Sequence, residues 1–320
     1  MDIIPNRPIW KKIIHSIHDG FWDSLGYPAT LSRRVHYGVL KAKRPHIQNT
    51  IWLRSVIKWQ TWLNYEENHI CYLHPGHNGD YDLLHRHIPQ LDGLVSNTVI
   101  KNYRCDISSV GGLSSSNNSD INIATLDDFA LEFSRELATP ISVDQLRKNL
   151  DHHRLRLYKM FFSQYSWMPG RLYWNNIDGI QHFTAVRYLS IQLGVPVQLK
   201  GELNSFNLNL KKVQQLTDVW DLYLLPDKEV YGILLDCLLR VKIPLGISNA
   251  PDWENGENTK YRIIWLERDK IIPARVSRFL TQATRLSRPT ATRKTLATTG
   301  SARVTPFSSC AKRRSSIAPV

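Results

Sequence analysis

Cysteine is scarce in this sequence, and the few cysteines form no pattern. The 320 residues include four of them, with no C-x-x-C spacing: Cys71, Cys105, Cys237 and Cys310. Structural zinc sites and the disulfide frameworks of small secreted domains both need several cysteines at short, regular spacings. The sequence therefore excludes a zinc-finger module and a fold held together by disulfides.

Long apolar runs and long functional motifs are also missing. No apolar run approaches the ~20 residues that a membrane-spanning helix requires. The opening residues, MDIIPNRPIWKK, lack the charged, apolar and small-residue regions of a secretory signal peptide. The sequence contains no G-x-S-x-G, Walker or G-x-G-x-x-G motif. We therefore expect a soluble protein with no membrane span, located in the cytoplasm.

Acidic residues are absent after Asp269, and this absence explains most of the formal charge of +13. Of the 41 Lys and Arg residues, ten lie within 274–320, which leaves 31 against 28 Asp and Glu, a net charge of +3, in residues 1–273. The tail 274–320 also holds fifteen Ser and Thr and few large apolar residues, so we expect it to be disordered. It is either an electrostatic arm for nucleic acid or acidic membrane, or a weakly constrained extension, such as a frameshifted end.

Apolar spacing predicts an α/β fold with a mixed sheet. Residues 1–107 are irregular and rich in Trp and His, residues 108–120 are typical of a mobile loop or linker, and residues 121–273 form the predicted domain. Within the domain, helices at 180–193, 210–217 and 228–241 alternate with predicted strands at 171–176, 195–199, 203–208, 221–225, 243–247 and 261–266. Several connections are too short for parallel crossovers, which favours a mixed sheet.

Two capping boxes predict the helices that open this domain. T-x-x-D at 125–128 begins the first helix, and S-x-x-Q at 142–145 begins a second one that runs to about Phe162. On the second helix, three basic residues share one face with His152: Lys148, Arg156 and Lys159. Such a face either contacts nucleic acid or is the solvated side of a surface helix.

The turn before the helix at 180–193 is the most informative local feature. Asp178-Gly179 places a glycine at the start of the helix, so the first backbone N–H groups, of Gly179, Ile180 and Gln181, face the space in front of it. Those donors and the helix dipole both favour a bound anion. Two arginines are candidate cations for a phosphate: Arg171 and Arg187.

Two nearby side chains provide candidate chemistry. His182 is a candidate proton donor or acceptor, and Asp178 is a candidate for positioning the turn or a cation such as Mg²⁺. An Asp and a His beside a phosphate suit phosphoryl transfer or hydrolysis. The alternative is a tight turn in which His182 bonds the neighbouring backbone.

These residues carry two family resemblances. Asp178-Gly179-x-x-His182-x-x-Ala185, followed by G-x-P-V at 194–197, resembles the D-G-x-H-R-x-x-A…G…V-P box of the ParB/sulfiredoxin-like fold. The resemblance implies a strand–turn–helix–strand core that binds nucleotide phosphates at the helix start. Phe183 replaces the arginine of the box, and Gln181 stands where sulfiredoxin chemistry needs a cysteine, which excludes that activity. Residues 171–247 also resemble an uncharacterised bacterial domain family with a Y-W-x-N-x-D-G-x-H-H-F-A-A-A-R-Y core.

Histidines cluster within residues 69–87. H-x-x-H at 74–77 crosses a Pro-Gly turn, whereas H-x-H at 85–87 would point both rings to one side of a strand. With a carboxylate, four residues are candidate ligands for zinc or iron: His74, His77, His85 and His87. The turn residues in the same segment offer a simpler explanation of its composition.

Three hypotheses about function follow. The first is binding of a phosphate-bearing small molecule or nucleotide at 178–182, with or without phosphoryl transfer or hydrolysis. The second is a non-enzymatic module that contacts nucleic acid or protein through the basic helix face and the tail. The third is a metal-dependent enzyme built on the histidines of 69–87.

Overall fold

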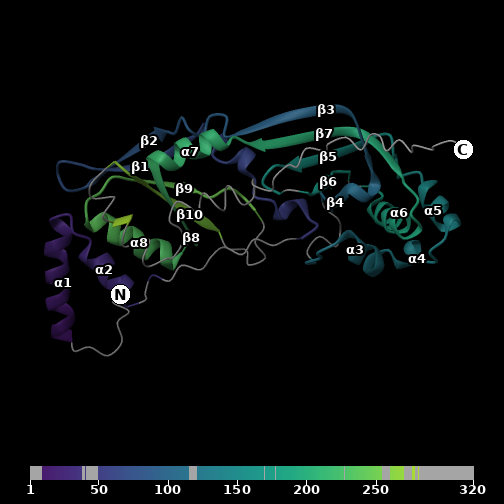
Figure 1. Cartoon of the computed structure of the whole chain (residues 1–320). Coiled ribbons are helices and arrows are strands. Elements are labelled where there is room, and N and C mark those ends of the chain that lie inside the picture. The colour runs from purple at the N-terminus through teal and green to yellow at the C-terminus, as the bar shows by residue number, and fades with distance from the viewer. Residues whose placement is uncertain are drawn as a thin grey trace, which may run out of the picture.

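The protein is a mixed α/β structure with two sheets, which confirms the predicted fold class. The computed structural model describes residues 9–37, 40, 50–114, 121–168, 170–176, 178–226, 228–253, 260–269, 276–277 and 280. These residues contain eight α-helices and two five-stranded sheets. The sheets occupy two adjacent parts of an elongated molecule, each with its own helices (Figure 1).

The first sheet is antiparallel throughout and joins strands from both ends of the chain. Its strands, in spatial order, are β2 (Tyr81–His87), β1 (His69–Pro75), β9 (Leu245–Asn249), β10 (Tyr261–Glu267) and β8 (Trp220–Pro226). Helix α8 (Glu229–Arg240) packs on one face, together with α2 (Ala29–His36). Helix α7 (Leu210–Val219) packs on the other (Figure 1).

The second sheet is mixed and carries the helix start singled out by the sequence. Its strands, in spatial order, are β3 (Val95–Asp106), β7 (Gln198–Leu208), β5 (Met160–Tyr165), β6 (Leu172–Trp174) and β4 (Val110–Leu113). The pairs β7–β5 and β6–β4 are parallel, and the others are antiparallel. Helix α6 (Ile180–Leu193) lies among three further helices at this end of the molecule: α3 (Leu126–Phe133), α4 (Arg135–Ala138) and α5 (Val143–Leu150) (Figure 1).

Buried aromatic side chains fix α6 on the second sheet. The Trp174 ring at the end of β6 stacks on Phe183 in the first turns of α6, with centroids 4.0 Å apart. Both side chains are almost completely buried, and Val186 and Leu189 continue the same buried face of the helix. Because these side chains remove a large apolar area from water, the start of α6 is held firmly against the end of β6.

Several local predictions are confirmed. Helix α6 has the predicted bounds, and it follows β6 and precedes β7, as expected for a strand–turn–helix–strand core. Both predicted N-caps are present: Thr125 Oγ1 accepts from the backbone N–H of Asp128 at 3.1 Å, and Ser142 Oγ accepts from that of Gln145 at 3.2 Å.

The predicted helix from 142 to 162 is wrong beyond Leu150. Helix α5 ends there, and β5 begins at Met160. Phe162 is fully buried in β5, whereas Phe161 is 45% exposed, so the side chains alternate as in a strand. Pairing with both β6 and β7 stabilises this strand, and such long-range hydrogen bonds override local helical periodicity.

The loop predicted at 108–120 is wrong for its first part, because Val110–Leu113 form β4. A Cβ at Gly112 would lie 2.5 Å from Cε1 of Tyr173 and 2.9 Å from the Ile51 carbonyl oxygen. The glycine at this position therefore permits close packing and does not indicate flexibility. Likewise, the two strands predicted at 195–199 and 203–208 are one strand, β7, that continues through Gly201.

The region predicted to be irregular, 1–107, contains α1 (Ile9–Ser24), α2 and the strands β1–β3. Nearly all of the basic tail, from residue 281 onward, and residues 115–120 lie outside the described residues. The prediction of a disordered tail therefore stays a prediction.

Candidate functional site

The residue before α6 must be glycine, and a segment distant in the sequence packs against this glycine. Gly179 has a φ of +80°, a conformation that favours glycine, and no side chain caps the helix from this position. A Cβ at Gly179 would lie 3.2 Å from the carbonyl oxygen of Arg154. The segment between α5 and β5 therefore passes directly beside the first turn of α6.

Asn149 determines the orientation of the His182 ring. The Asn149 amide nitrogen donates to the carbonyl oxygens of Leu137 and Gln145, at 2.8 and 2.9 Å. Its oxygen is therefore the acceptor for His182 Nδ1, 2.9 Å away. In the neutral ring this contact places the proton on Nδ1 and leaves Nε2 as the acceptor. Asn149 is 1% exposed, so this orientation is held from within the protein.

His182 also stacks on His152, in a group of side chains that can carry positive charge. The two ring centroids are 3.6 Å apart, with 14° between the planes. Burial lowers the pKa of His182, and three neighbours lower it further: His152, His153 and Arg154. Burial also lowers the pKa of His152, with contributions from His153 and Arg154. Because both pKa values lie below the usual 6.5, the two rings are mainly neutral at pH 7, and a nearby anion would favour their protonation.

The remaining residues of the predicted anion site differ in their placement. Asp178 is exposed in the turn, and Ile180 is buried under the first turn of α6. The Gln181 amide nitrogen donates to the Phe133 carbonyl oxygen at 3.3 Å, so this side chain joins α6 to the end of α3.

Neither predicted arginine reaches the start of α6. Arg171 precedes β6, at the opposite end of this strand from the turn, and its guanidinium donates to the Thr50 carbonyl oxygen. Arg187, two turns into the helix, donates to the Val110 carbonyl oxygen at 2.7 Å and to Asp127 at 2.5 Å. Both guanidinium groups hold other elements in place, so the structure does not bring them together with Asp178 and His182.

The predicted basic helix face does not exist, because helix α5 ends at Leu150. Lys148 is exposed on α5, whereas Arg156 and Lys159 are exposed in the segment that follows it. The Lys159 carbonyl oxygen accepts from the Asn176 amide at 3.2 Å, which ties this segment to the residues just before the Asp178-Gly179 turn. Sequence reasoning missed Asn149, His153 and Arg154, although the run His152-His153-Arg154 in a basic stretch was a usable signal.

The histidines of residues 69–87 do not converge. In the hairpin of β1 and β2, His74 pairs with Asp82, His85 with Cys71, and His87 with His69, while His77 lies in the turn between the strands. His87 Nε2 is 3.2 Å from a carboxylate oxygen of Asp92. Within the described part of the chain, no three His, Cys, Asp or Glu side chains are grouped as metal ligands would be.

A comparison with known protein families finds a match over more than half of the chain. The model of DUF6685, a family of unknown function, matches residues 100–287. The chain belongs to this family. The DUF6685 range contains the start of α6 and the segment that passes beside it, and it excludes α1 and the hairpin histidines. No curated protein and no solved structure matches the chain. In the described residues, no helix has the length and apolar character needed to cross a membrane.

Proposed function

We propose that this DUF6685 protein binds a phosphate-bearing small molecule or nucleotide at the start of α6. The proposal rests on one observation: two structural features lie together at Gly179. One is a fourteen-residue helix whose first N–H groups have no side-chain cap. The other is the group His152, His153 and Arg154, close enough to affect the pKa of His182. Uncapped N–H groups, a helix dipole and neighbouring cations are the features that bind phosphate in proteins.

Two further observations support a ligand at this place. His152 Nδ1 is shielded from solvent and has no hydrogen-bond partner among the described residues. A shielded polar atom without a partner costs free energy, and a ligand oxygen would remove that cost. The resemblance of Asp178-Gly179-x-x-His182 to the phosphate-binding box of the ParB/sulfiredoxin-like fold adds to the proposal, with Arg154 supplying a cation in place of the arginine missing at Phe183.

The same arrangement supports a specific role for each polar residue. The backbone N–H groups of 179–181 would hold the phosphate oxygens, and the exposed Asp178 carboxylate would contact the Mg²⁺ of a bound nucleotide. His182 Nε2 would accept a proton from an attacking water if the ligand is hydrolysed. Binding without turnover needs only the N–H groups and the cations.

The proposal predicts measurable binding that depends on Arg154. Isothermal titration with ATP, CTP and inorganic phosphate should detect binding by the wild type to at least one of them. Arg154→Ala should weaken it about tenfold, since one charged hydrogen bond contributes about 1.5 kcal/mol. Sulfate, whose charge is constant from pH 5 to 8, should bind more tightly as the pH falls below 6.5 and protonates His182 and His152. This pH effect should shrink in His182→Gln.

Arg147→Ala is the matched control, because Arg147 is exposed on the nearby helix α5 and has no part in the pKa shift of His182. It should leave the affinity unchanged. Absence of binding by the wild type, or an equal loss in both arginine variants, would eliminate the phosphate site.

A second candidate function is binding of nucleic acid along the same basic segment. The Lys200 backbone N–H donates to the Leu157 carbonyl oxygen at 2.8 Å, and Arg104 on β3 lies opposite Lys200 on β7. Like charges that face each other across a sheet are unfavourable unless an anion lies over them. The exposed cations thus extend beyond the reach of one phosphate group, which favours a polyanion.

This candidate predicts a salt dependence that a small ligand would not show. The triple variant Lys148→Ala, Arg156→Ala and Lys159→Ala should reduce the slope of log affinity against log salt for single-stranded RNA or DNA by about two. Deletion of 274–320 tests the contribution of the basic tail in the same assay. An unchanged slope in the triple variant, or no retention of nucleic acid by the wild type, would contradict this function.

A further inference from the structure

Exposed apolar side chains are concentrated at the N-terminal helices. Of the 21 large hydrophobic side chains that are exposed in the described residues, eight lie between residues 13 and 37: Ile13, Ile14, Ile17, Phe21, Trp22, Leu25, Tyr27 and Tyr37. Isolated exposed hydrophobic residues are ordinary, but a contiguous group of this size marks an interaction surface.

One face of α1 is uncovered along its described length. This face, called the α1 outer face below, consists of residues spaced three or four apart: Ile13, Ser16, Ile17, Gly20, Phe21 and Ser24. Its three large side chains, Ile13, Ile17 and Phe21, are 54%, 68% and 59% exposed. A Cβ added at Gly20 would meet no described atom within 4 Å.

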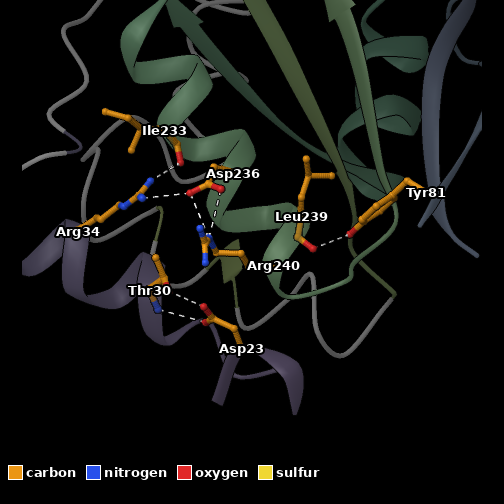
Figure 2. Close-up of polar contacts among 8 residues, drawn as sticks. All are labelled: Asp23, Thr30, Arg34, Tyr81, Ile233, Asp236, Leu239 and Arg240. Atoms are coloured by element: carbon orange, nitrogen blue, oxygen red, sulfur yellow. Dashed lines mark hydrogen bonds and ion pairs between the residues drawn. The ribbon is translucent and has the colours of Figure 1, made fainter. Parts of the chain in front are cut away.

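Another side of α1 contacts α2 through two buried carboxylates. Asp23 is 1% exposed and accepts from Thr30 at the start of α2, at 3.1 Å from the backbone N–H and 2.5 Å from the hydroxyl (Figure 2). Asp19 is 6% exposed and pairs with Arg33 of α2 at 2.7 Å. Two buried carboxylates that are both paired fix the rotation of α1 about its axis, so its apolar outer face stays directed away from α2.

Helix α2 is in turn fixed to the body of the protein. The Arg34 guanidinium donates to the Ile233 carbonyl oxygen at 3.1 Å and pairs with Asp236 at 3.0 Å, both on α8 (Figure 2). Leu31 of α2 is completely buried against the α8 side of the first sheet. The α1 outer face is therefore presented by a fixed scaffold.

The large and small residues of the α1 outer face alternate so that two antiparallel copies of the helix fit each other. If a second α1 lies against the first about a two-fold axis midway between Ile17 and Gly20, Ile13 faces Ser24, Ser16 faces Phe21, and Ile17 faces Gly20. Each large residue then meets a small one, and every contact occurs twice, as a two-fold interface requires. Gly20 and the two serines also permit the close approach of two helices.

We propose that the α1 outer face binds a second copy of this chain, with the two α1 helices antiparallel. Ile14 and Leu25, 56% and 55% exposed, flank the three central pairs. Five side chains per copy, each covering roughly 100 Å², would bury about 1,000 Å² in total, the lower end for a specific interface. The dimer is therefore weak, with a dissociation constant on the order of 10 μM.

Sedimentation equilibrium of the full chain at 2–200 μM tests the proposal. The wild type should show a mass that rises toward twice 37.0 kDa. Gly20→Ile should raise the dissociation constant at least tenfold, because Ile17 of the partner then meets a branched side chain. The double variant Ile17→Ala with Gly20→Ile exchanges the large and small positions and should restore the dimer. Leu131→Ser, at an exposed leucine of α3, is the control and should change nothing.

The outcomes separate this partner from other occupants of the same face. If general hydrophobic association were the cause, Gly20→Ile would strengthen it, since the variant adds apolar surface to the outer face. A wild type that stays monomeric at every concentration, or that binds anionic vesicles and no second copy, overturns the proposal, as does a double variant that stays monomeric. Circular dichroism confirms that each variant keeps its helices; Gly20→Ile raises the intrinsic helix propensity of α1.

Discussion

Gly201→Ala is expected to lower the free energy of unfolding by about 3 kcal/mol or more, because the added methyl group would overlap the backbone of a neighbouring strand. Gly201 lies in the middle of β7, beside Met160 of β5. A Cβ at this position would lie 2.5 Å from the carbonyl carbon and 2.9 Å from the Cα of Met160, and closer still to the carbonyl oxygen. A backbone cannot rotate away as a flexible side chain can, so β5 and β7 must separate where they pair.

Gly232→Ala provides the matched control in a urea titration. Gly232 lies within α8, and a Cβ there would have no atom within 4 Å among the described residues. Alanine should therefore stabilise the protein by about 0.5–1 kcal/mol, through helix propensity alone. If Gly201→Ala unfolded at the wild-type urea concentration, the close approach of β5 and β7 described above would be incorrect.

Arg187→Ala is expected to lower the free energy of unfolding by about 2–3 kcal/mol, the second largest of the effects predicted here. The Arg187 side chain is 14% exposed and bonds three elements: the carbonyl oxygens of Val110 and Ser108 and the carboxylate of Asp127. Val110 is completely buried, and removal of the guanidinium takes away the donor to its carbonyl oxygen. Arg187→Lys should recover only part of the loss, because one ammonium group cannot reproduce the planar fork.

Arg240→Ala is the control for this measurement. Arg240 pairs with Asp236 one turn away, and the two side chains are 50% and 43% exposed, so the variant should change the stability by less than about 0.5 kcal/mol. The same variants also separate two roles for Arg187. If Arg187→Ala weakened sulfate binding and left the unfolding transition in place, the guanidinium would be an anion ligand, as the sequence predicted.

The start of α6 shows which structural features local sequence patterns can predict. The Asp178-Gly179 turn and the bounds of α6 both followed from the sequence. Each depends on interactions within about four residues: a glycine conformation, helical spacing and the boundary of an apolar stripe. The two N-caps, Thr125 and Ser142, were predictable for the same reason.

The partners of α6 were not predictable in this way. Asn149 contacts His182 across 33 positions of the chain, and Arg187 contacts Val110 across 77. The contact of Arg154 with Gly179 depends on α5 ending at Leu150, and the sequence around that point has no glycine or proline to end a helix. A single sequence carries no signal for such pairs, because the side chains that meet are chosen by packing.

The sequence by itself determined the α/β class, the turn at Asp178-Gly179, the positions of α6, α7 and α8, and the separation of a nearly neutral body from a basic tail. These features follow from local backbone preferences, apolar periodicity and composition. Only the tertiary structure decided that Arg171 and Arg187 hold other elements, that His152 stacks on His182, and that α1 presents an apolar face outward. Those outcomes depend on which surfaces, distant in the sequence, pack against each other, and that packing exists only in the folded chain.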